Sequence, residues 1–260
     1  MGGNNTIINS GNISGGNGGL SSFSSMAGGV GIITYGDDTI TNSGSISGGM
    51  SGNGATRANA ILFNGTGNRL ELLTGSAITG NIEFANSSGG TIAALNSGMN
   101  LTNAIVLGNA SALTFDTSTG QALEASGIIS GSGTVAVSGG TSAIVFSANN
   151  SYTGTTAISS GATLQLGNGG TTGSLGTGNV VNDGTLVVNR SNTVSMNNNM
   201  SGTGNLTQAG TGTTILSGNN SYTGTTTISS GTLQVGNGGT SGTLGNGDVV
   251  NDSALVINRS

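Results

Sequence analysis

The chain has 260 residues, of which 52 are glycine, 33% are apolar and only 5% are charged, with a formal net charge of −5. Low charge with this apolar content excludes a disordered polyelectrolyte, and a pI near 4.1 with four cations argues against nucleic acid as a partner. The sequence has no cysteine and no histidine, which excludes disulfide bridges, thiol nucleophiles and imidazole bases.

The first predicted elements repeat within the N-terminal third. Residues 6–16 (TIINSGNISGG) return as residues 39–49 (TITNSGSISGG), at an offset of 33. Short apolar runs follow, separated by Asn-Gly, Ser-Gly and Gly-Gly pairs that favour turns with positive φ. These runs predict strands at residues 60–63, 70–72, 77–79, 81–84, 91–93, 104–107 and 112–115.

The C-terminal part of the sequence contains two copies of one repeat. Residues 149–156 (NNSYTGTT) return as residues 219–226, and residues 164–170 return as residues 233–239 with one exchange. Within the short strands, apolar side chains alternate with Thr, Gln, Ser and Asn, so that one face of each strand is apolar. A fixed period predicts a solenoid in which each unit buries its apolar face on the next. Each copy of about 70 residues is predicted to form about three coils of roughly 23 residues.

The sequence therefore predicts an all-β solenoid with essentially no α-helix, since no stretch shows helical periodicity. The absence of proline agrees with strands that are paired on both sides, because proline cannot donate to a strand ladder. We expect residues 1–260 to form one continuous segment: N-terminal Asn-Ser-Gly repeats and irregular coils (1–129), a first copy (130–200) and a truncated second copy (201–260). No apolar run approaches the ~20 residues of a transmembrane helix, and no secretory signal follows Met1.

Few side chains offer reactive chemistry, so we predict no catalytic residue, no metal site and no cofactor. Glu71 and Glu83 are the one pair weighed as glycosidase carboxylates, against solvated surface residues. Asp248 follows a Gly-Asn-Gly run that faintly resembles a calcium-binding roll, without its nine-residue tandem repeat. Asp183 and Asp252 share one repeat position, where we expect a turn with an Asx hydrogen bond and not a metal ligand.

Two further pairs of residues recur with the repeat. Arg190 and Arg259 each follow an asparagine at the end of a strand, and we expect solubilising surface groups there. Tyr152 and Tyr222 are the repeated aromatic residues. They are weighed as exposed contacts for sugars or proteins, against packing at a coil corner.

Residues 217–245, and their first copy at 147–176, resemble the autotransporter-associated β-strand repeat. Residues 39–49 and 67–81 are similar to other stretches of the same passengers. The resemblance implies a single-stranded right-handed parallel β-helix from the passenger domain of a type V secretion autotransporter, associated with virulence. It also implies a secretion signal, an outer-membrane barrel of the same polypeptide, and display outside the cell or at the Gram-negative cell surface.

The function implied is a non-catalytic adhesin or stalk that contacts host matrix, glycans or other copies of itself. The alternative is a scaffold for an enzyme-bearing passenger whose catalytic module lies outside these residues. A third interpretation is that coil-by-coil stacking drives folding outside the cell.

Overall fold

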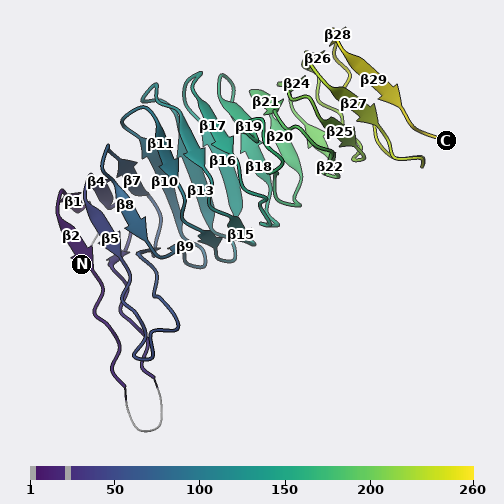
Figure 1. Ribbon diagram of the computed structural model, residues 1–260. Helices are drawn as coiled ribbons and strands as arrows, with labels where there is room; N and C mark the ends of the chain where they lie inside the picture. The colour runs from purple at the N-terminus through teal and green to yellow at the C-terminus, as the bar shows by residue number, and fades with distance from the viewer. Residues whose placement is uncertain (1–3, 21–24) are drawn as a thin grey trace.

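The computed structural model describes residues 4–20 and 25–260 (Figure 1). In these residues every regular element is a strand, and the named strands pair in parallel. The chain winds as a solenoid of about nine turns along its longest sheet, which contains nine strands. The predicted all-β parallel solenoid is confirmed, and each strand predicted between residues 60 and 115 overlaps an observed one.

Three columns of strands form the faces of the solenoid. Face 1 is one sheet of β1 (Thr6–Asn9), β4 (Thr39–Asn42), β7 (Asn68–Leu72), β10 (Gly89–Ala94), β13 (Ala112–Asp116), β16 (Thr134–Ser138), β18 (Thr156–Ile158), β20 (Val180–Asn182) and β23 (Met200–Ser201).

Face 2 consists of two sheets in succession. The first contains β2 (Asn12–Ser14), β5 (Ser45–Ser47) and β8 (Ala77–Thr79). The second contains β11 (Met99–Leu101), β14 (Leu123–Ala125), β17 (Ala143–Phe146), β19 (Thr163–Leu166), β21 (Thr185–Val188), β24 (Asn205–Gln208), β26 (Thr226–Ile228) and β28 (Val249–Asn251).

Face 3 is also divided into two sheets. The first contains β3 (Ile32–Thr34), β6 (Ile61–Phe63), β9 (Ile82–Phe84), β12 (Ile105–Leu107) and β15 (Ile129–Gly131). The second contains β22 (Val194–Met196), β25 (Thr213–Leu216), β27 (Thr232–Val235) and β29 (Ala254–Ile257). Between them, backbone hydrogen bonds continue the column through residues 151–153 and 174–177.

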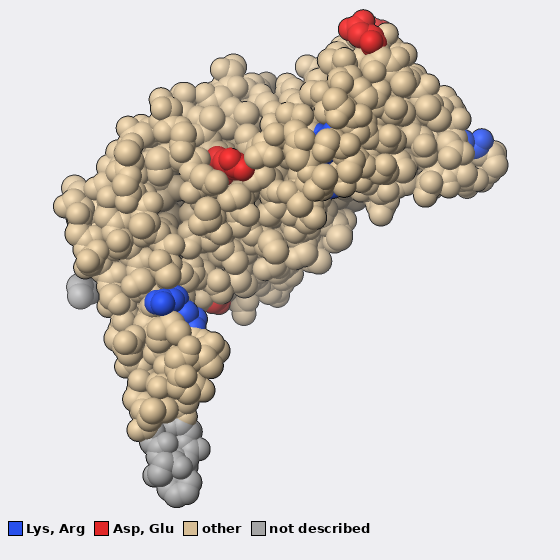
Figure 2. All heavy atoms as spheres, viewed as in Figure 1, with Lys and Arg blue, Asp and Glu red and all other residues tan. Residues whose placement is uncertain are grey.

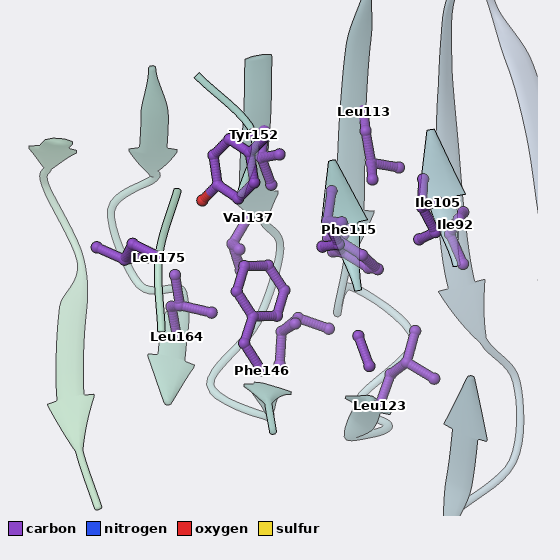
Figure 3. Close-up of a cluster of buried hydrophobic side chains, with 14 of the residues drawn as sticks. Ile92, Ile105, Leu113, Phe115, Leu123, Val137, Phe146, Tyr152, Leu164 and Leu175 are labelled. Carbon is purple, nitrogen blue, oxygen red and sulfur yellow. The ribbon is translucent and has the colours of Figure 1, made fainter. Parts of the chain in front are cut away.

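The core is a continuous column of apolar side chains inside the three faces (Figure 3). Strand alternation creates it: in β7 buried and half-buried residues alternate along all five positions. Aromatic rings of successive coils also touch, with ring centroids 4.8 Å apart for Phe63 and Phe84 and 5.4 Å apart for Phe115 and Phe146. Each such side chain contributes about 1.5–3 kcal/mol when it is buried.

The first coils are longer than the later ones. Asn9 pairs with Asn42 across the first coil, at a sequence separation of 33. Thr41 pairs with Glu71 across the next coil, at a separation of 30. Later coils on face 1 are shorter, as the register from β16 to β23 shows. Among the extra residues of the first coils, residues 15–20 and 25–31 after β2 and residues 48–60 after β5 project together from the side of the solenoid (Figure 1).

The two copies of the repeat are rotated relative to each other. The strand β16 lies on face 1, but its counterpart β24 lies on face 2; likewise β17 lies on face 2 and its counterpart β25 on face 3. From β16 to β24 the chain adds three more strands to face 1 and then moves to the next face. One copy therefore spans about three and one-third coils.

This value is close to the predicted three coils for each copy. On face 1, β16 pairs with β18, β18 with β20 and β20 with β23, so that three coils are complete at β23. The counterpart of β16 is not β23 but the following strand, β24, on the next face. Because three coils use fewer residues than one full period of the repeat, the period extends past three coils by one face.

Candidate interaction surface

The visible surface is almost free of charge (Figure 2). On face 2 the outward positions of consecutive coils are Val145, Gln165, Val187, Thr207 and Thr227. Such a surface offers neutral hydroxyl, amide and methyl groups in register at the ~4.8 Å spacing of neighbouring strands. Its chemistry suits many weak contacts and lacks the charge needed for strong electrostatic attraction.

The carboxylates considered for glycoside hydrolysis are not brought together. Glu71 lies on β7 of face 1 and binds Arg69 at 2.8 Å and the Thr41 hydroxyl at 2.9 Å. Glu83 lies on β9 of face 3 and accepts a hydrogen bond from Asn59. Two carboxylates on different faces with separate partners do not flank a common substrate.

Arg69 instead joins two acids of face 1 in an ion-pair cluster. Its guanidinium lies 2.8 Å from Glu71 and 3.0 Å from Asp116. Burial acts to raise the pKa of Asp116, but hydrogen bonds from Ser118 and the charge of Arg69 outweigh it, so that the pKa is lowered. Because these three charged side chains pair with one another, we interpret them as a structural ion-pair cluster on the surface and not as a reactive site.

In the described residues, no group of three or more acidic side chains is placed to hold a metal ion. Asp183 accepts hydrogen bonds from the amide and hydroxyl of Thr203 in the next coil, at 2.9 and 3.1 Å. The Asx hydrogen bond expected at Asp183 is made by its neighbour Asn182, which accepts from the amide of Gly184 at 3.2 Å. Asp183 thus links two coils.

Tyr152 and Tyr222 are both completely buried, so the interpretation of these residues as exposed contacts is wrong. Their hydroxyls pair with Thr156 Oγ1 at 2.6 Å and Thr226 Oγ1 at 2.7 Å. Burial raises the pKa of both phenols. Figure 3 shows the Tyr152 ring within the apolar column, which agrees with the packing alternative.

Arg190 is a second correction, because the predicted surface arginine is only 6% exposed. Its guanidinium donates to the carbonyl oxygens of Thr171 and Gly173 and to the side chain of Asn192. Burial lowers the pKa of Arg190. The side chain therefore closes the loop of residues 167–173. Arg259, its counterpart, is exposed as predicted and donates to the Thr240 carbonyl at 2.6 Å.

Two grooves lie where a face passes from one sheet to the next. Groove A, between β8 and β11 on face 2, is lined by residues 72, 76–78 and 99–103 and has a volume of about 200 Å³. Groove B, between residues 174–177 and β22 on face 3, also includes Asn150, Leu166 and residues 194–198 and has a volume of about 320 Å³.

The same asparagine contact crosses each groove. In groove A, Asn103 donates to the carbonyls of Ile78 and Gly80 at 2.9 and 2.8 Å. In groove B, Asn198 donates to the carbonyls of Gly176 and Gly178 at 2.9 and 2.6 Å. Neither groove was predicted from the sequence. A signal was present, since residues 99–105 (MNLTNAI) and 194–200 (VSMNNNM) share the asparagine and the flanking apolar spacing.

The stacked parallel coils define a β-solenoid repeat protein. The passenger-associated-transport-repeat family (PATR) matches residues 130–166 and 206–235, within the two copies described above. The resemblance to autotransporter passengers is thereby confirmed, and it is carried by these two segments.

A short stretch of the chain is similar to a curated protein, the "Adhesin BmaC autotransporter" of Brucella suis biovar 1 (strain 1330). It is 53% identical over 49 residues, which are 19% of this chain and 1% of that adhesin. No solved structure matches the chain. Among the described residues, no helix is long and apolar enough to cross a membrane.

Proposed function

We propose that the chain is part of an autotransporter passenger, displayed at or released from a Gram-negative cell surface, and that it acts as an adhesin or as the stalk of one. The observation that carries the proposal is a continuous column of coils whose outer faces carry few charges. The similarity to an autotransporter adhesin supports the same function. Residues 1–260 act as one continuous solenoid segment in this proposal.

The rotation of the copies gives this adhesin a way to engage several partners. Thr153 follows Tyr152 on face 3, whereas its counterpart Thr223 follows Tyr222 on face 1. Equal surface segments thus face different directions, about 16 Å apart along the axis if each coil rises ~4.8 Å. Several weak contacts on one rod strengthen attachment through effective concentration.

The proposed partners are host matrix, glycans or other copies of the chain, together with an outer-membrane barrel of the same polypeptide as anchor. We assign no catalytic role: Glu71 and Asp116 are both paired with Arg69, and Glu83 and Asp183 each bind other partners. The alternative of a scaffold for an enzyme module depends on residues outside this chain, and no feature of the fold favours it.

The test is a bead assay with the purified chain. Beads coated with residues 1–260 are expected to adhere to matrix proteins, to immobilised glycans or to one another, and soluble chain is expected to compete. Beads coated with the chain after thermal unfolding serve as the control for nonspecific adsorption. If folded and unfolded chain adhere equally to every surface, the adhesin function is excluded and a passive spacer remains.

A further inference from the structure

We propose that groove A and groove B are binding sites for neutral saccharides. The inference rests on the proposed adhesive function and assigns it to two defined places on the solenoid. Both grooves lie where a strand, β11 or β22, is the terminal strand of its sheet. Each therefore offers backbone groups along an edge that no neighbouring named strand pairs.

The lining has the chemistry of a sugar-binding surface. Groove B is lined by half-buried Val194 and by the nearly buried Leu175 and Met196, beside exposed Thr177 and Ser195. Groove A is lined by half-buried Met99 and exposed Thr102. A pyranose ring has an apolar C–H face and hydroxyls that both donate and accept, so it can contact an apolar side chain and pair with amide and hydroxyl side chains at the same time.

Charge selects the kind of saccharide. The residues that line either groove include no Asp, Glu, Lys or Arg. An anionic sugar that entered would lose hydration without gaining a cationic partner, which costs free energy. A neutral ligand has no such penalty, so the grooves favour neutral over sialylated or sulfated glycans.

The asparagine contacts argue against an inserted peptide strand. A strand between two coils needs ~4.8 Å on each side, about twice the normal spacing of the coils. Asn198 bonds directly to the carbonyls of Gly176 and Gly178, and Asn103 does the same at Ile78 and Gly80. The coils are held together at one end of each groove, which leaves room for a ring and not for a strand.

Size sets the expected length of the ligand. The 320 Å³ of groove B lies at the lower end of ligand pockets, which range from ~300 to 1,000 Å³, and groove A at 200 Å³ is smaller. One or two sugar rings fit this range, and we expect millimolar dissociation constants, which correspond to about −4 kcal/mol. The grooves lie on different faces, so one rod contacts a glycan surface in two directions.

The test is titration of the folded chain, followed by two-dimensional amide NMR. The neutral probes are lactose, cellobiose and diacetylchitobiose; the charged probe is sialyllactose; the peptide probe is Gly-Ser-Thr-Ser-Gly. Saturable shifts confined to residues 174–177 and 194–198, and to 76–78 and 99–103, are expected with at least one neutral sugar. Sialyllactose is expected to bind at least tenfold more weakly than lactose.

Ser195→Tyr and Thr102→Tyr fill groove B and groove A respectively, at positions that are exposed. Each variant is expected to abolish the shifts of its own groove and to leave the other groove unchanged. The matched control is Thr207→Tyr, which adds the same ring on the outer side of β24, away from both grooves. Preserved amide spectra elsewhere establish that each variant is folded.

The proposal is overturned if no neutral probe gives saturable shifts at the grooves, if the peptide binds there instead, or if both groove variants bind as the control does. Bead adhesion is measured with the same variants. Adhesion that persists after both grooves are filled refutes the grooves as the adhesive sites and leaves the adhesin function standing. Sugar binding without any bead adhesion supports the grooves and counts against the adhesin function.

Discussion

The two copies of the repeat give one sequence two structural settings. Tyr152 and Tyr222 are buried alike and make the same hydroxyl contact in each copy. Arg190 and Arg259 differ: Arg190 is enclosed by the carbonyls of Thr171 and Gly173 and by Asn192, whereas Arg259 is exposed. The comparison teaches that the burial of a repeat position depends on the neighbouring coils as well as on its own sequence: Val188 is 1% exposed, whereas its counterpart Ile257 is 63% exposed.

The largest expected effect is at the tyrosines. Tyr152→Ala is expected to cost about 3–5 kcal/mol of local stability, because it removes a fully buried ring and leaves a cavity. Tyr222→Ala is expected to cost a similar amount if the copies are equivalent inside. Hydrogen exchange of the surrounding amides measures the cost for each coil separately.

Tyr152→Phe is the matched control, since it keeps the ring and loses only the hydroxyl contact with Thr156. It is expected to cost about 1 kcal/mol. A cost for Tyr152→Ala below that of Tyr152→Phe would contradict burial of this ring.

The arginines should separate the two copies. Arg190→Met removes the donor to the carbonyls of Thr171 and Gly173 and is expected to cost about 2–3 kcal/mol. Arg259→Met is expected to change stability by no more than about 0.5 kcal/mol, as at other exposed sites. Denaturant unfolding, followed by exchange of amides 167–173 and 236–242, measures both. An equal loss of stability in the two variants would contradict the difference in burial between Arg190 and Arg259.

Two glycines in the loop that Arg190 closes, Gly167 and Gly169, provide a further test of its packing. Gly167 has φ +76°, and an added Cβ would lie 2.6 Å from the Asn189 carbonyl. Gly167→Ala is therefore expected to cost more than the ~1–2 kcal/mol of left-handed strain alone. Gly169→Ala is the matched control, because its φ is +90° and an added Cβ would meet nothing within 4 Å. A smaller cost at Gly167 than at Gly169, in thermal or denaturant unfolding, would refute the close approach.

The smallest expected effect is a pH dependence of stability that is confined to the first coils and absent from the two copies. Hydrogen bonds from the amide of Tyr35 and from Asn5 lower the pKa of Asp38 below its ordinary 3.8. A lowered folded-state pKa contributes stability that is present above pH ~4 and is lost as the pH falls through the lowered value. Acid should therefore weaken exchange protection around β1, β3 and β4.

Asp38→Asn is the matched control for this pH dependence. It should remove the acid-dependent loss near β4 while leaving the exchange of residues 130–200 unchanged. An identical acid response in wild type and variant would show that Asp38 is not its source.

Much of this molecule was readable from residue spacing. Two-residue alternation in short runs such as 104–107 and 112–115 places strands almost where they occur, since one face of each must be buried. The duplicated text in residues 149–170 and 219–239 indicates stacked equivalent coils. Composition likewise anticipated a surface with few charges.

Other properties follow only from how the coils meet. Whether Arg190 is buried depends on the carbonyls of Thr171 and Gly173, which lie 19 and 17 residues away in the chain, and on nearby Asn192. The rotation of the copies depends on the number of residues in each coil, which varies from one coil to the next. The alternation of apolar and polar residues within a strand does not reveal that number. The two grooves arise where the strands of adjacent coils separate, and Asn103 and Asn198 span the gap.

The sequence by itself determined the strands, their inward faces and the stacking of a repeated unit, because these depend on the alternation and period of side chains along one chain. The tertiary structure decided which face each copy presents, which corners are closed and where the grooves lie. Those properties depend on the register between coils, and that register is set by contacts between residues that are distant in sequence.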